Sequence, residues 1–173
     1  AVSVNDVPIA MFALADSLKA DSMTAIASLK KLGLTTIMLS GDKQSVADYI
    51  GGQVKIDTAI GELSPRDKAT KISELQQNGK KVAMVGDGVN DAPAMATATA
   101  SFAVQNGTDI AQHSASARLM GDGSHSISHV LSAVTIARAT LRNIKQNLFF
   151  AFIYNMIGIG FAMVGLLNPM LAA

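Results

Sequence analysis

Short apolar runs alternate with amphipathic stretches over the first 146 residues of the chain. The apolar runs are shorter than a typical helix and predict strands at residues 9–14, 35–39, 82–85 and 101–104. The stretches between them carry apolar residues at helical spacing. Strands that alternate with helices are typical of an α/β domain built on a parallel sheet.

Two of the amphipathic stretches carry helix start and stop signals. The first follows Asp21 or Ser22, either of which can cap a helix, and ends at Gly33. The second covers residues 66–78 and ends at Gly79. The side chains predicted to face the core are Ile26, Leu29, Ile72 and Leu75.

Residues 148–167 contain no charged side chain, and about 20 helical residues span the roughly 30 Å of a bilayer core. The alternative is a buried helix, but the rest of the chain is too short to surround so long an apolar rod. Arg138, Arg142 and Lys145 precede the segment and no Lys or Arg follows it, so the positive-inside rule places its amino-terminal side in the cytosol. We therefore expect a cytosolic domain over residues 1–146 and a transmembrane helix with the start of a further segment over 147–173.

Two carboxylates follow the predicted strand at 82–85, in the string Met-Val-Gly-Asp-Gly-Val-Asn-Asp-Ala-Pro of residues 84–93. The apolar run before it predicts a central strand, and ligands bind beyond the carboxyl ends of such strands. Glycines allow the backbone to turn tightly beside a phosphate, and carboxylate oxygens such as those of Asp87 and Asp91 suit Mg²⁺. A Gly-Asp-Gly tripeptide alone is more often an ordinary turn, but the ten-residue string predicts a magnesium and phosphate site.

Composition narrows the possible functions. A length of 173 residues with 49% hydrophobic residues allows one sizeable domain, and a net charge of +1 gives no reason to expect a nucleic acid partner. The chain has no cysteine, which excludes disulfides, zinc-thiolate sites and thiol catalysis. Its first residues lack the basic leader of a secretory signal, and no Met initiates them, so we expect the chain to begin within a longer protein.

Five segments together resemble the carboxy-terminal part of a P-type ATPase of the heavy-metal branch, most like the copper(I)-exporting pumps. They are residues 14–22, 38–42, 65–68, 84–93, and 142–148 with 151–155, in family order. The resemblance implies a partial haloacid-dehalogenase-like Rossmannoid phosphorylation domain followed by a transmembrane helix. It also implies Mg²⁺ and ATP as cofactors, Cu⁺ as the transported ion, and as partners the lipid bilayer and the rest of the ATPase chain, in an integral protein of the plasma membrane.

The resemblance assigns roles to matching positions. Asp87 would bind Mg²⁺, Asp91 would hold Asp87, the metal's waters or the phosphate in register, and Lys68 would neutralise phosphate oxygens. The Ser40 hydroxyl and the Gly41 amide would grip the phosphoryl group. The nucleotide-binding or orienting residues would be Asp42, Gly86, Gly88 and Asn90.

Two of these residues also have simpler interpretations. Asp42 is nearly as well explained as the cap of a helix over residues 43–50. Lys68, without the family context, is a surface lysine near a helix start.

Tyr154 and Asn155 match a pair at the intramembrane metal site of copper(I) pumps. Chemistry alone does not select copper, because Cu⁺ prefers thiolate and thioether ligands and this segment offers only Met156 and Met163. An asparagine at membrane depth is a functional hypothesis by default, with an interhelical hydrogen bond as the alternative.

The family's Asp-Lys-Thr-Gly-Thr motif, which carries the phosphorylated aspartate, does not occur in the sequence. We therefore expect the chain alone to be inactive. Three hypotheses remain: part of a working copper(I) pump; a truncated inactive remnant or non-catalytic membrane-tethered module; and a stand-alone phosphatase. The last would need Asp16 as its nucleophile, and Leu18 stands where such enzymes carry a second aspartate.

Overall fold

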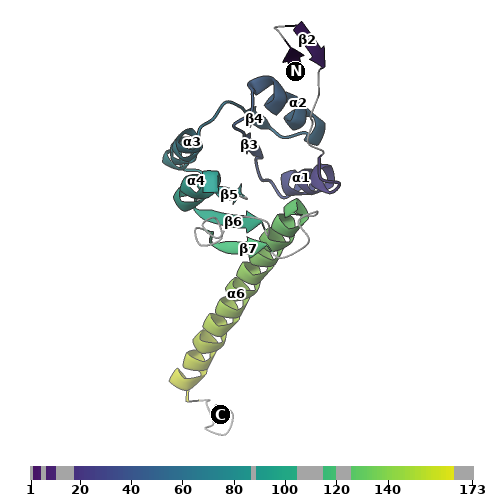
Figure 1. Cartoon of the computed structure of the whole chain (residues 1–173). Coiled ribbons are helices and arrows are strands. Elements are labelled where there is room, and N and C mark those ends of the chain that lie inside the picture. Colours follow the sequence, from purple (N-terminus) through teal and green to yellow (C-terminus); the bar gives the residue numbers. More distant parts are fainter. Residues whose placement is uncertain are drawn as a thin grey trace. The chain divides into compact units, whose positions relative to one another are not determined.

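The computed structural model describes residues 2–4, 7–10, 18–86, 89–104, 115–119 and 126–165 (Figure 1). The chain forms two compact units, Ala1–Val130 and Leu131–Ala173. The domain boundary predicted at residue 146 is based on the absence of charged residues from 148 to 167, and it stays a prediction.

Strands and helices alternate along the first unit, as the hydrophobic pattern predicts (Figure 1). In chain order the described elements are β1 (Val2–Val4), β2 (Val7–Ala10), α1 (Ser22–Lys31), β3 (Ile37–Leu39), α2 (Gln44–Val54), β4 (Thr58–Ile60), α3 (Pro65–Gln77), β5 (Ala83–Gly86), the 3₁₀ turn η1 (Val89–Asp91), α4 (Ala92–Thr97), β6 (Ala100–Val104), β7 (Ala117–Leu119) and α6 (Ser126–Met163).

The described strands form three sheets. β1 and β2 pair antiparallel, β3 pairs with β4 in parallel, and β5, β6 and β7 form a parallel sheet in that order. β5 and β6 are paired from Ala83 with Ala100 to Gly86 with Ala103. The parallel pairing confirms the predicted α/β class, because it requires the helical connections that the sequence places between strands.

The predicted central position of β5, apolar on both faces, is not reproduced among the described strands. β5 pairs with β6 only, among the described residues, and so lies at the edge of the sheet. Ala83 is exposed and Val85 is 38% exposed. Among the described residues no strand pairs with the free edge of β5, and some of its apolar side chains are exposed on the faces of the sheet.

The sequence pattern missed β1, β4 and β7, which have three residues each. Three residues are too few for a period of two to stand out from chance. The strand predicted at 9–14 corresponds to β2, which ends at Ala10, and residues 11–14 lie outside the described part of the chain.

Helices α1 and α3 lie where the amphipathic pattern predicts them. Ile26, Leu29 and Ile72 are buried and Leu75 is half-buried. Gly33 and Gly79 follow the two helices with φ of +77° and +75°, the left-handed conformation that ends a helix.

The predicted N-cap position of α1 is confirmed at Asp21, but a capping side chain is not. Asp21 is the N-cap residue, but its side chain makes no capping hydrogen bond to α1, and Ser22 is the first helical residue.

The core beside the three-stranded sheet is formed by α4. Ala94 and Met95 of this helix are 0% and 1% exposed, and Met95 packs with Ala103 of β6 and Met84 of β5. This packing fixes α4 and the turn η1 before it against the carboxyl end of β5.

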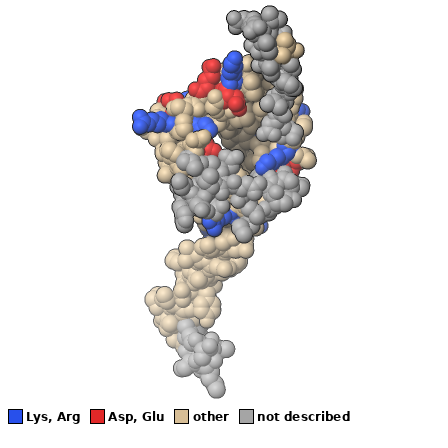
Figure 2. All heavy atoms as spheres, in the orientation of Figure 1, with Lys and Arg blue, Asp and Glu red and all other residues tan. Residues whose placement is uncertain are grey.

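The second unit contains the greater part of α6, a helix of 38 residues and therefore about 57 Å long. Its segment Ile127–Met163 is the only one in the described ranges that is long and apolar enough to cross a membrane, and no part of the apolar window is buried. The exposed side chains weaken the alternative of a core helix. In Figure 2 the lower part of this helix shows neither blue nor red atoms.

The helix ends at Met163 and a turn with Gly165 at φ +70° follows, so the predicted end at residue 167 is too late.

Candidate functional site

The predicted site lies at the carboxyl end of β5. Gly86 is the last residue of this strand and Asp91 ends the 3₁₀ turn that follows. Asp87 and Gly88, between them, lie outside the described residues. The geometry of the site is therefore defined by Gly86, Asp91 and the side chains that contact them.

Lys68 and Asp91 form an ion pair, with 2.9 Å between Nζ and Oδ1. The two residues are 23 positions apart, and each side chain is only 14% exposed. A partly buried pair is screened less by salt than a surface pair. Lys68 is therefore not the exposed surface lysine of the alternative interpretation, but a cation held beside the carboxylate that follows β5.

A capping box holds the start of α3 and with it Lys68. The Asp67 amide donates to Ser64 Oγ at 3.2 Å, and the Ser64 amide donates to Asp67 Oδ2 at 2.9 Å. Hydrogen bonds from the Ser64 hydroxyl and then its amide lower the pKa of Asp67. Ser64 is not among the predicted site residues, although a serine three residues before an acidic residue at a helix start is a recognisable signal.

Gly86 allows Asp91 to approach the strand closely. A Cβ at Gly86 would lie 2.7 Å from Asp91 Cβ and 2.9 Å from Asp91 Oδ2. It would also lie 3.0 Å from Met95 Sδ, in the packed core of α4. The predicted role of Gly86 as a position of close backbone approach thus has a specific neighbour, the Asp91 carboxylate.

Ser40, Gly41 and Asp42 form a loop after β3. Ser40 Oγ donates to Asp42 Oδ2 at 2.8 Å and accepts from the Asp42 amide at 3.1 Å. The interpretation of Asp42 as a helix cap is wrong, because α2 begins at Gln44 with Lys43 as its N-cap and no capping side chain. Asp42 instead orients the Ser40 hydroxyl, while the Gly41 amide has no acceptor among the described residues.

Gln44, the first residue of α2, connects this loop to β4 through hydrogen bonds of its side chain. The sequence did not indicate this role. Its Oε1 accepts from the Gly61 amide at 2.6 Å, and its Nε2 donates to the Ala59 carbonyl at 3.0 Å. Backbone bonds add to this, since the Leu63 amide donates to the Ser40 carbonyl at 3.0 Å. The loop is therefore joined to the segment that leads into α3 and Lys68.

The described structure groups the predicted residues into two clusters. Ser40, Gly41 and Asp42 form one, and Lys68, Asp91 and Gly86 form the other, with no hydrogen bond or ion pair between the described members of the two. Asn90 is exposed in η1. Tyr154 and Asn155 lie on α6 in the second unit, both exposed.

The described residues do not by themselves form a metal site, since they contain no group of three or more potential ligands among His, Cys, Asp and Glu. Asp91 nevertheless supplies a partly buried carboxylate at a strand end, which is the donor type that Mg²⁺ uses in small number beside substrate oxygens. Lys68 supplies a cation beside it. This pairing suits a substrate that brings its own anionic oxygens, such as a phosphoryl group.

Residues 2–99 match the family model described as haloacid dehalogenase-like hydrolase. Three relatives cover nearly the whole chain. A probable cation-transporting ATPase of Haemophilus influenzae is 54% identical over 99% of this chain, a probable copper-importing P-type ATPase A of Enterococcus hirae 48% over 94%, and a copper-exporting P-type ATPase of Staphylococcus aureus 44% over 99%. The chain spans only 23%, 22% and 21% of the length of these relatives.

The fold is also similar to solved structures. A zinc-transporting PIB-type ATPase in its E2.Pi state aligns over 91% of this chain and 25% of that one, with a TM-score of 0.79 and 36% identity.

Proposed function

Because this chain belongs to the haloacid dehalogenase-like hydrolases and its relatives are cation-transporting P-type ATPases, we propose that it is part of an ATP-driven pump that exports monovalent copper. In this proposal the chain supplies the magnesium- and phosphate-handling half of the phosphorylation site and one membrane helix. The observation that supports this proposal most strongly is the ion pair of Lys68 and Asp91 at the end of β5. Each of the two side chains is 14% exposed.

The residues of the site would divide the work of phosphoryl transfer. Mg²⁺, when bound by Asp87 with Asp91 beside it, would neutralise phosphate charge. Lys68, which Asp91 holds in place, would bring its ammonium group to the same oxygens. Such pre-positioned charges need no rearrangement as negative charge shifts between oxygens.

The loop after β3 would bind the phosphoryl group from another side. The Gly41 amide would donate to it directly, and Ser40 would do so after turning its hydroxyl away from Asp42. Asp42 thereby keeps the hydroxyl ordered when no phosphate is present. Gly86 and Gly88 would let the backbone approach, and Asn90 would lie at the nucleotide side.

The acceptor aspartate would belong to a strand outside this sequence. Support comes from the two parallel sheets, because among the described residues β5 ends one of them with Val85 38% exposed and β3 pairs only with β4 in the other. A further parallel strand at the open edge of β5 would pair with its free backbone N–H and C=O groups. On this proposal the chain alone neither hydrolyses ATP nor transports metal.

The metal would pass α6 at Tyr154 and Asn155. Zinc is the second candidate cargo, because the solved structure of a zinc transporter is similar to this chain. Zinc prefers Cys, His and carboxylate ligands, and residues 131–163 contain none of these. Met156 and Met163 are thioethers, which suit soft Cu⁺ better.

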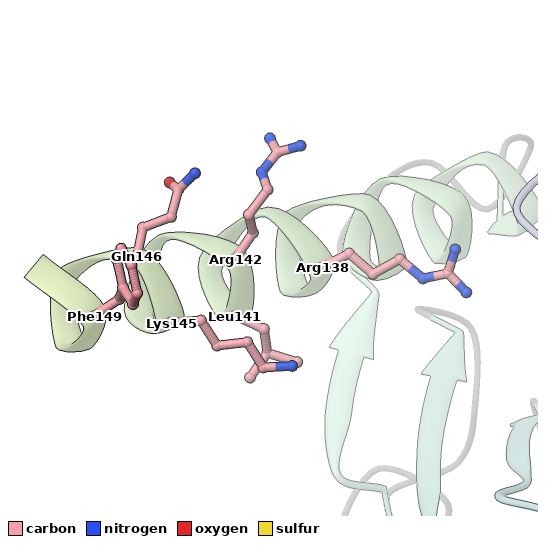
Figure 3. A pocket seen from close by; sticks show the side chains of 6 residues that line it. All are labelled: Arg138, Leu141, Arg142, Lys145, Gln146 and Phe149. Atoms are coloured by element: carbon pink, nitrogen blue, oxygen red, sulfur yellow. The ribbon is translucent and has the colours of Figure 1, made fainter.

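Three cations favour a cytosolic position of the first unit. Arg138, Arg142 and Lys145 lie at intervals of four and three residues along α6 and line a shallow surface depression with Leu141, Gln146 and Phe149 (Figure 3). In Figure 3 the Arg142 side chain points away from the helix axis, whereas those of Arg138 and Lys145 run roughly along the helix. Cations at one end of a span are retained on the cytosolic side.

The test is transport into inside-out vesicles that carry the full-length protein. We expect ATP-dependent uptake of Cu⁺ and not of Zn²⁺, with loss of uptake in Asn155→Ala. The matched control is Asn147→Ala, an asparagine of the same helix before the apolar segment. Uptake of Zn²⁺ alone would favour the second cargo, and movement of Cu⁺ out of these vesicles would reverse the direction.

Two other results would replace the proposal. Absence of ATP-dependent transport for every metal would favour an inactive remnant. Metal-independent hydrolysis of a small phosphate ester that is lost in Asp16→Asn would favour a stand-alone phosphatase.

A further inference from the structure

Asp21 contacts a helix that begins more than a hundred residues after it. The backbone amide of Ser128, in the first turn of α6, donates to Asp21 Oδ2 at 3.0 Å. Both residues belong to the first unit. We propose that Asp21 is a positioning residue that caps α6 and fixes the start of this helix to the α/β unit.

Asp21 would then stabilise the starts of two helices, α1 through its backbone carbonyl and α6 through its side chain. The backbone carbonyl of Asp21 accepts from the Ala25 amide at 2.9 Å and from Thr24 Oγ1 at 3.0 Å, which begins α1. The side chain makes no capping bond to α1 and goes to α6 instead. The local sequence, which points to a cap of α1, therefore assigns the carboxylate to the wrong helix.

The electrostatics of α6 favour this arrangement. The first amides of a helix have no partner within it, and their aligned dipoles attract a negative charge. The first turn of α6 contains no acidic residue of its own, and Asp21 brings a carboxylate to it. Asp21 is only 7% exposed, and a charge so far from water is retained at lower cost where amides donate to it.

Burial along α6 agrees with an anchor at its first turns. Val130 is 6% exposed, whereas Ile136 is 66% and Leu141 is 58% exposed. The contact of Asp21 therefore lies at the buried start of a helix that continues without a break to Met163. On the proposed function, a shift of the α/β unit during phosphoryl transfer would reach Tyr154 and Asn155 through this fixed start.

Hydrogen exchange on the full-length protein tests the cap directly. In Asp21→Ala we expect the amides of the first turns of α6 to exchange about fivefold faster, the effect of losing one cap, and those of α1 to be unchanged. Asp21→Asn, which keeps an acceptor oxygen, should lie between Asp21→Ala and the wild type. Faster exchange in α1 with α6 unchanged would overturn the proposal, and so would no change in either helix.

Metal-stimulated turnover tests separately whether the start of α6 couples the α/β unit to Tyr154 and Asn155. Asp21→Ala should form phosphoenzyme within twofold of the wild type but lose about fivefold in metal-stimulated turnover, with partial rescue in Asp21→Asn. The control is Asp57→Ala, which removes a carboxylate that binds Lys30 and Thr36 within the same unit. Equal losses of phosphoenzyme and turnover in Asp21→Ala, or the same coupling loss in the control, would contradict a positioning role. A wild type without phosphoenzyme would refute the proposed function and leave the exchange test intact.

Discussion

Several large apolar side chains are buried in the first unit, whereas those along the apolar part of α6 are mostly exposed. In the first unit apolar side chains such as Ile72 and Met95 are 1% exposed, and charged groups meet partners. Along α6 from Leu148 onward the large apolar side chains are exposed, with Phe152 at 61% and Ile159 at 61%. Water can stabilise the first arrangement, whereas the second requires an apolar surrounding. The apolar part of α6 therefore needs an apolar surrounding that the described residues do not supply.

The largest expected effect comes from the partly buried ion pair of Lys68 and Asp91. Lys68→Met should lower phosphoenzyme formation in the full-length protein by about 100-fold or more, because a charge beside the reacting oxygens is lost. It should also lower stability by about 2 kcal/mol, since the Asp91 side chain, 14% exposed, would lose its partner.

Lys71→Met is the matched control on the same helix. Lys71 pairs with Glu74 at 3.0 Å, but the two side chains are 40% and 52% exposed, so we expect little change in either quantity. Equal effects of the two substitutions would contradict the role of Lys68. Radioactive ATP labelling and thermal denaturation measure the two quantities.

A charged side chain introduced on α6 tests whether its apolar segment spans a membrane. Ile157→Arg should reduce membrane insertion by about 100-fold, because an arginine near a bilayer centre costs about 3 kcal/mol. Thr135→Arg places the same charge on the same helix before the apolar segment and should insert normally. Extraction at alkaline pH separates inserted from peripheral protein, and equal extraction of the two variants would argue against a span.

A methyl group at the end of β5 should have a smaller effect. Gly86→Ala should lower phosphoenzyme formation about tenfold, because its Cβ would lie 2.7 Å from Asp91 Cβ and displace the carboxylate. Gly52→Ala in α2 is the control, since nothing lies within 4 Å of its Cβ and alanine favours a helix by about 0.5–1 kcal/mol. Normal labelling of Gly86→Ala would show that Asp91 tolerates displacement.

The smallest expected effect concerns pH. The Lys30 ammonium, followed by the Thr36 amide and hydroxyl, lowers the pKa of Asp57 to about 2. A carboxylate with a lowered folded-state pKa stabilises the fold above its unfolded pKa of about 4 and loses this effect as the pH falls toward 2. The thermal midpoint of Asp57→Asn should therefore lie below that of the wild type above pH 4, and the difference should shrink toward pH 2.

The control for this titration is Glu74→Gln, which removes an exposed carboxylate. A difference between wild type and Asp57→Asn that stays constant from pH 5 to pH 2 would contradict the assignment.

The sequence could predict those features that depend on local spacing. The alternation of apolar runs and helical stretches predicts the α/β class, and the uncharged segment after Lys145 predicts the exposed apolar helix. The buried faces of α1 and α3 follow from period alone, as Ile26 and Ile72 show. Within the described site, the motifs of residues 65–68 and 84–93 point to Lys68 and Asp91, whereas the ion pair between the two side chains is evident only from the fold.

Features that depend on contacts between distant segments could not be predicted. The edge position of β5 reflects which strands pair, and no residue of β5 encodes this. Asp21 and Asp42 both resemble helix caps in sequence, yet one carboxylate binds an amide 107 residues away and the other binds Ser40. Gln44 has no sequence signal because its partners, Ala59 and Gly61, are brought near it only by the fold.

Labelling with radioactive ATP tests the central claim most directly, that this chain carries the metal- and phosphate-handling half of a phosphorylation site. In the full-length protein we predict an acid-stable phosphoenzyme whose turnover rises with Cu⁺ and whose amount falls at least 100-fold in Asp87→Asn. Wild-type labelling and turnover in Asp87→Asn would contradict the claim.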